Sequence, residues 1–162
     1  MGKCKARKLF AAIALAAALV VGFAQQSQAL FDKTRFVTDL GVAYFCFHHW
    51  VSNPYREGKF QSGAPHRTAT IVKAGVALLF AVNRLKAANR IAHTSKDPLL
   101  HKIAGSLDNM VNSFDSIGHK FKSGNFGKSD VDSLTGAYTG MDSSARAANL
   151  NVKDVPIAVP GT

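Results

Sequence analysis

Large apolar residues recur between Leu100 and Phe121 at gaps that alternate strictly between three and four residues. This spacing places them on one face of an α-helix, in the heptad pattern by which helices pack against one another. Asp97 and Pro98 precede the run as an N-cap acceptor and a first-turn proline, and Gly124 follows it as a C-terminal stop. Such a face is not stable in water, so the rest of the chain must supply a helical fold that covers it.

Three other segments repeat this spacing and predict three more helices. They span residues 31–51, 68–94 and 129–148, and Ser129 is the expected N-cap of the last one. A strand is the alternative for residues 42–51, where β-branched and aromatic residues are dense. No turn signal provides that strand with a hairpin partner, so we favour the helix.

The connections between these helices differ in length. Residues 52–65 are rich in proline and glycine and predict a long loop between the first two helices, whereas the next two connections are short. Short connections favour antiparallel neighbours. We therefore predict an all-α, up-down four-helix bundle over residues 30–149, followed by an extended C-terminal tail over residues 150–162.

The first 29 residues have the composition of a secretory signal peptide. Four cations and no acid precede an apolar run over residues 9–24, and residues 27–29 (Ser-Gln-Ala) are a small-x-small cleavage signal. The alternative is an uncleaved N-terminal anchor, but the run is short for a membrane span and rich in alanine. We expect the mature chain to begin at Leu30 and to be exported to the periplasm, cell envelope or extracellular space.

Residues 30–162 form a single domain that is large enough to bury a core without covalent cross-links. Cys46 is the one cysteine in this part of the chain, so an internal disulfide is excluded. We interpret it as a small apolar filler, with an intermolecular disulfide as the alternative. Lys73 and Arg84 interrupt the apolar segment 68–94, which therefore predicts a helix with one buried face rather than a membrane span.

Positive charge is concentrated in the middle of the chain. The formal net charge is +10, and the four cations before residue 30 account for part of it. Nine basic and two acidic residues lie between positions 56 and 102, whereas acids slightly outnumber bases from position 103 onward. This distribution predicts a basic helix that binds anions; the alternative is that carboxylates on neighbouring helices balance its charge. The basic residues off the apolar seam are Arg67, Lys73, Arg84, Lys86 and Arg90.

Aromatic residues gather just before this basic helix. Trp50, Tyr55 and Arg56 form a second candidate binding patch, with Phe60 close by in the sequence. Aromatic anchors of this kind are typical of recognition loops. The alternative is a loop that plugs one end of the bundle.

The histidines offer little support for a metal or haem site. The helical pattern turns His49, His101 and His119 outward and leaves only His48 and His93 at the border of an apolar face. Length, export and architecture resemble those of the haem-carrying four-helix cytochromes, but the C-x-x-C-H motif is absent. A periplasmic haem- or metal-binding bundle that uses His48 or His93 remains the alternative function.

The sequence contains no catalytic motif. Glu57 is the single glutamate, which excludes the Glu-rich di-metal bundles, and neither a nucleophile elbow nor a P-loop is present. We therefore predict a non-enzymatic binding or structural protein without a cofactor, whose basic helix contacts an anionic envelope surface or an acidic protein partner. Export and the lack of aromatic residues between the basic ones argue against nucleic acid. A Gly-x-x-x-Gly pattern at residues 136–140 is compatible with a homo-oligomer.

Overall fold

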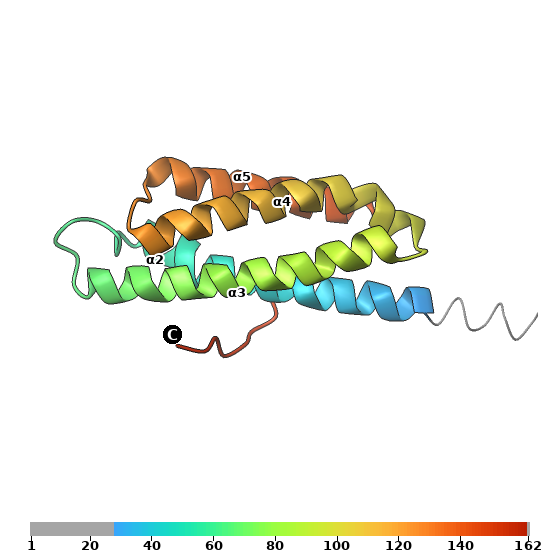
Figure 1. Ribbon diagram of the computed structural model, residues 1–162, viewed down its shortest axis with the longest axis horizontal. Helices are drawn as coiled ribbons and strands as arrows, with labels where there is room; N and C mark the ends of the chain where they lie inside the picture. Colours follow the sequence, from blue (N-terminus) through green and yellow to red (C-terminus); the bar gives the residue numbers. More distant parts are fainter. Residues whose placement is uncertain (1–27, 162) are drawn as a thin grey trace, which may run out of the picture.

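The computed structural model describes residues 28–161 of the 162-residue chain, and every regular element in that range is helical (Figure 1). The all-α prediction is therefore confirmed. Residues 28–47 form an α-helix that continues through a π-helical turn, η1 (His48–Ser52), into α2 (Asn53–Arg56). We call residues 28–56 the first helix. The predicted signal peptide, residues 1–29, lies outside the described residues except for its last two positions.

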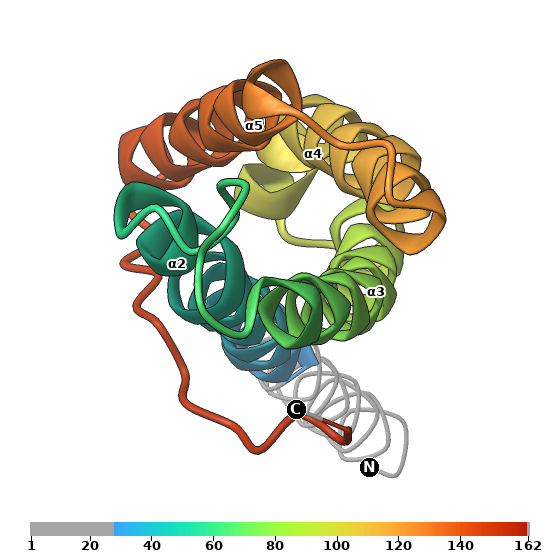
Figure 2. The same cartoon turned by 90° about the vertical axis from the view of Figure 1, so that its left-hand side faces the viewer.

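Three longer helices follow, and they complete four helical segments within the described part of the chain. They are α3 (Arg67–Thr94), α4 (Pro98–Ser123) and α5 (Lys128–Ala147). Consecutive segments run in opposite directions (Figure 1). α4 lies beside both α3 and α5, while η1 contacts both α3 and α5, so that the four segments surround one core when seen from one end (Figure 2).

The apolar seam of α4 forms the centre of this core. All its large side chains between Leu100 and Phe121 at the predicted seam positions are buried. Both predicted ends of the helix are confirmed: the Asp97 carboxylate accepts the backbone N–H of Leu99 at 2.8 Å, and Gly124 adopts the left-handed conformation with φ 73°. Local capping chemistry and seam spacing therefore define α4.

Cys46 contributes to the core as expected for an apolar filler. Its side chain is fully buried, and this burial raises the pKa of the thiol to about 11. A neutral, inaccessible thiol is a poor nucleophile at neutral pH.

The first helix extends further than the sequence pattern indicates. It continues through Ser52 and Pro54 to Arg56, so the connection to α3 covers residues 57–66 rather than 52–65. Proline disrupts an α-helix because it lacks the N–H that bonds four residues back. Here the preceding turn is already π-helical, with the N–H of Asn53 bonded to the carbonyl of His48, and Pro54 occupies the first turn of α2.

The start of α5 also differs from the prediction. Gly127, not Ser129, is the N-cap, and Ser129 lies inside the first turn. The reason is the Asp130 carboxylate, which accepts the backbone N–H of Gly127 at 2.8 Å and the ammonium of Lys120 at 2.6 Å. An aspartate held between a backbone donor and a cation stabilises the helix N-terminus better than a serine hydroxyl does.

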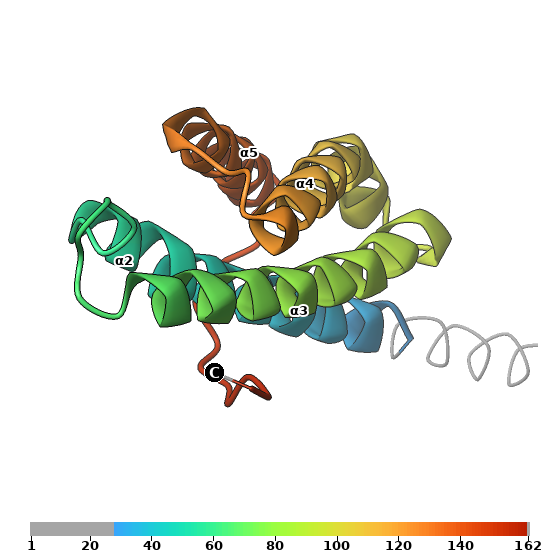
Figure 3. The same cartoon turned by 60° about the vertical axis from the view of Figure 1, so that its left-hand side comes forward.

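The C-terminal tail is docked on the first helix, on the side away from α4 and α5 (Figure 3). The Val155 N–H donates to the carbonyl of Gly41 at 3.0 Å, and the imidazole of His48 contacts the Asp154 carboxylate at 2.8 Å. A Cβ atom at Gly41 would collide with the backbone oxygen of Lys153. Glycine is therefore required at position 41 for the tail to approach this closely.

Candidate functional site

The structure separates the eight predicted binding residues into two groups. Five of them lie at the end of the bundle where the 57–66 turn meets α3; we call this the loop-end surface. The other three lie further along α3, and we call them the mid-helix cations. The loop-end residues are Trp50, Tyr55, Arg56, Arg67 and Lys73. The mid-helix cations are Arg84, Lys86 and Arg90.

A hollow of about 320 Å³ lies on the loop-end surface between α2, the 57–66 turn and the connection from α4 to α5. It combines three cations with three aromatic rings, and none of the carboxylates in the described chain lines it. The larger side chains that line it are Tyr55, Arg56, Phe60, Gln61, Arg67, Phe126 and Lys128. Arginine next to aromatic rings suits a planar anionic group, because the guanidinium donates in pairs while the rings exclude water.

An aromatic cluster holds this hollow in place. Phe60 is buried, and its ring meets Phe121 and Phe126 edge-on with centroids 6.0 and 5.4 Å apart. Phe121 and Phe126 stack at 3.9 Å. The Arg67 Nε–H donates to the carbonyl of Phe60 at 2.9 Å and ties the first residue of α3 to the turn. The turn thus closes the bundle end through Phe60 and still leaves Arg56 at the surface.

The charges of this hollow are only partly balanced. The Lys128 ammonium contacts the Asp132 carboxylate at 2.7 Å, and this hydrogen bond raises the pKa of Lys128. Arg56 is exposed and has no ion pair with the described residues, and Arg67 bonds a neutral carbonyl rather than a carboxylate. The hollow therefore keeps positive charge that a ligand can neutralise.

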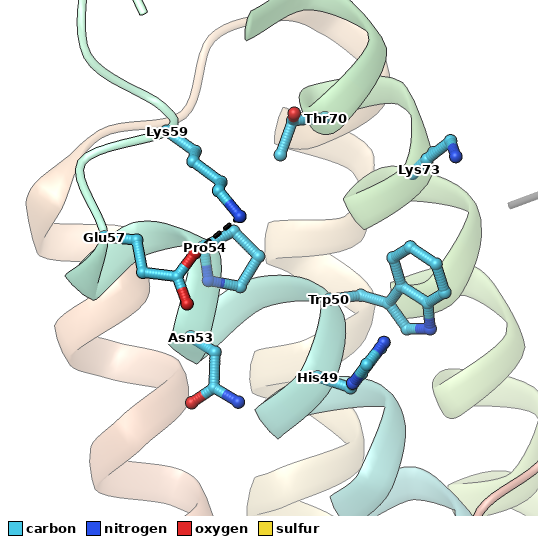
Figure 4. A pocket seen from close by; sticks show the side chains of 8 residues that line it. All are labelled: His49, Trp50, Asn53, Pro54, Glu57, Lys59, Thr70 and Lys73. Carbon is cyan, nitrogen blue, oxygen red and sulfur yellow. Dashed lines mark ion pairs between the residues drawn. The ribbon is translucent and has the colours of Figure 1, made fainter. Parts of the chain in front are cut away.

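A second hollow of about 280 Å³ adjoins the first helix and α3 (Figure 4). The Lys73 ammonium lies 5.8 Å from the centre of the Trp50 ring, within the range of a cation–π contact. Lys59 is paired with Glu57 at 2.5 Å, so Lys73 is the cation of this hollow that no described carboxylate neutralises. The buried Trp50 Nε1 has no hydrogen-bond partner among the described residues.

The mid-helix cations have different surroundings. Arg84 faces the buried carboxylate of Asp39 at 3.5 Å, and Lys86 faces Asp115 of α4 at 3.1 Å. Arg90 is exposed and makes no ion pair within residues 28–161. For Arg84 and Lys86, the structure thus matches the alternative in which neighbouring carboxylates balance the helix charge.

The two candidate metal ligands lie in separate contacts. His48 pairs with Asp154, whereas His93 contacts Asp108 at 3.1 Å. The hydrogen bonds from Asn89 and then from His93 lower the pKa of Asp108. Residues 28–161 contain no group of three or more histidine, cysteine or acidic side chains that could hold a metal ion. The alternative function therefore gains no support from the geometry.

Sequence reasoning missed four residues that line the first hollow, namely Gln61 of the 57–66 turn and Phe126, Gly127 and Lys128. Phe126, Gly127 and Lys128 lie in or next to a short segment rich in glycine and serine, which the sequence marks only as a link; in the structure Lys128 is the first residue of α5. These residues reach the site because α4 runs toward the 57–66 turn and α5 begins at the same end of the bundle (Figure 1), and helix spacing does not report such long-range proximity. The one local signal is a lone aromatic residue in a Gly-rich link.

No family model matches this chain, and no curated protein or solved structure is significantly similar to it.

Proposed function

We propose that this protein is an exported, non-enzymatic up-down bundle that binds an anionic surface of the cell envelope through its loop-end surface. In this proposal residues 30–149 form the bundle, and the recognition residues lie on the two helix ends that flank the connection between the first two helices. An acidic protein partner is the alternative ligand. The single observation that supports the proposal most is the hollow that joins Arg56, Arg67 and aromatic rings without a lining carboxylate.

The energetics of such a surface are favourable without any deep pocket. A lysine or arginine close to an anionic membrane contributes about 1 kcal/mol, and several together give reversible binding that salt weakens. Arg56, Arg67 and Lys73 have no described carboxylate partner that would have to be displaced first. Arg84 and Lys86, in contrast, would lose an internal ion pair on binding an external anion.

The test is cosedimentation of the chain from Leu30 onward with anionic and neutral vesicles over a salt series. This fragment contains the folded unit, because the described core is built from residues between Phe36 and Val159. We expect binding to anionic vesicles that weakens as salt rises. Arg56→Gln should lower the affinity about fivefold, the equivalent of about 1 kcal/mol.

Lys86→Gln is the matched control, since it removes one positive charge from an ion-paired position and should leave vesicle binding nearly unchanged. A protein that stays in the supernatant with anionic vesicles even at low salt would contradict the anionic-surface proposal. Binding to an acidic polypeptide in the same low-salt buffer, without vesicle binding, would instead support the acidic-partner alternative.

A further inference from the structure

α3 is apolar on two opposite faces, and the described residues cover the outer one only in part: Gly161 of the C-terminal tail lies near Val76, which is partly buried. The inner face packs into the core with Ala77, Leu78 and Ala81 fully buried. On the outer face Val72 is 58% exposed and Leu79 is 42% exposed. A helix that is apolar all round is normally covered on all sides, either by protein or by lipid.

The two exposed residues, Val72 and Leu79, share one face with the partly buried Val76 because of their spacing. Val72, Val76 and Leu79 are four and three residues apart and therefore line up along the helix; we call them the apolar strip. A shallow groove of about 260 Å³ runs beside this strip toward Phe121 and Lys122 of α4. Gly75 lines this groove, and a Cβ there would only make ordinary contact with the Cβ of Phe121 at 3.7 Å.

Cations lie on both sides of the apolar strip. Lys122 lines the groove on the α4 side, and Lys73 lies next to Val72 in the sequence and contacts Trp50 of the first helix. No carboxylate of the described chain lines the groove. In a symmetric dimer formed through this strip, the lysines of the two copies would be brought together, and such like-charge contacts oppose self-association.

We infer that the apolar strip is the face by which this protein contacts an anionic lipid bilayer, with Val72 and Leu79 reaching the acyl region and Lys73 and Lys122 at the headgroups. This inference rests on the proposed function and names its surface. An anionic bilayer supplies both chemistries at once, because its interior is apolar and its headgroups are negative. A stable protein interface would need a larger apolar area than three side chains provide.

In this inference α3 lies on the membrane surface and does not cross the bilayer. By length and composition α3 could span a bilayer, but 39% of its most apolar window is buried within the protein. Leaving the bundle would expose the fully buried face of α4, including Leu107 and Phe114. Lys73 belongs to both the loop-end surface and the border of the apolar strip, so the two surfaces can face one membrane together.

The experiment places an environment-sensitive fluorophore at Val72→Cys in the chain from Leu30 onward. Cys46 is fully buried, so the new thiol is the accessible one. With vesicles that contain anionic phospholipid we expect a blue shift and protection from an aqueous quencher. The same fluorophore at Thr139→Cys, an exposed position of α5 across the bundle from α3, should not respond (Figure 2).

A second variant measures the apolar contribution without changing charge. Val72→Ser combined with Leu79→Ser should lower vesicle affinity about tenfold, because the apolar contact with the bilayer is lost. The loss should persist at high salt, where the contribution of the cations is screened. Both positions are exposed, and circular dichroism will confirm that the fold is retained.

The outcomes separate this inference from the proposed function. Vesicle binding with an unresponsive Val72 probe and wild-type affinity of the double serine variant would overturn the inference and leave the anionic-surface proposal standing. Failure to bind vesicles at low salt would overturn both. A probe shift that grows with protein concentration alone, or that requires an acidic amphipathic peptide, would assign the strip to a protein contact and overturn the inference.

Discussion

The two groups of cations on and beside α3 are alike in sequence but differ in what surrounds them. Arg84 and Lys86 lie between the first helix and α4, and each neighbour provides a carboxylate. Arg56 and Arg67 lie at the bundle end, where the neighbouring segments provide aromatic rings and a backbone carbonyl. The same residue types therefore stabilise the fold at one place and remain available to an external anion at the other.

The difference between the two groups of cations is tested most strongly at Arg84. Its partner Asp39 is more buried than Asp115, the partner of Lys86. Asp39 is 7% exposed, so Arg84→Met leaves a nearly buried carboxylate without its cation. We expect a loss of about 2 kcal/mol in the free energy of unfolding, less than for a fully buried pair because the Arg84 side chain is partly exposed. Urea denaturation measures this loss, and vesicle binding should remain near that of the wild type.

Asp39→Asn in the Arg84→Met background is the control, since it removes the unpaired charge and should restore part of the lost stability. Equal stability of Arg84→Met and the wild type would show that the Arg84–Asp39 contact has no structural role. A large loss of vesicle binding in a folded Arg84→Met protein would remove the distinction between the two groups.

The second prediction concerns Lys120, a cation in the last turn of α4 whose acidic partner, Asp130, is buried. Lys120 contacts Asp130, and the hydrogen bonds from Lys120 and then from the Gly127 N–H lower the pKa of that carboxyl. A carboxyl whose pKa is lower in the folded protein than in the unfolded chain stabilises the fold above the unfolded value of about 4. This stabilisation disappears as the pH falls through the folded pKa.

We therefore expect Asp130→Ala to lose about 1 kcal/mol of stability at neutral pH, the usual value of an N-cap contact. Below pH 4 the stabilities of the variant and the wild type should converge. Denaturant unfolding over a pH series measures this. Asp132→Ala, at an exposed site two residues away, is the control and should leave the acid dependence of stability unchanged. A constant difference in stability between Asp130→Ala and wild type at all pH values would contradict a stabilising role for the ionised Asp130 carboxylate.

The features that depend on short sequence windows could be predicted, and those that depend on long-range contacts could not. Seam spacing and capping chemistry located α4, because both act within a few residues. The contact between Asp39 and Arg84 joins positions 45 residues apart and depends on how two helices are aligned. The position of Phe126 and Lys128 beside the first hollow likewise depends on how the helices of the bundle are aligned.

The smallest expected loss of stability is at Lys86, whose ion pair is more exposed to water than that of Arg84. Its partner Asp115 is 40% exposed and its own side chain is 52% exposed, so water solvates both groups after the pair is broken. Lys86→Gln should therefore cost less than about 1 kcal/mol in unfolding free energy. Thermal denaturation at low and high salt measures this, and the difference from the wild type should shrink as salt screens the pair. A loss as large as that of Arg84→Met would mean that burial of the partner carboxylate does not set how much Arg84 and Lys86 each stabilise the fold.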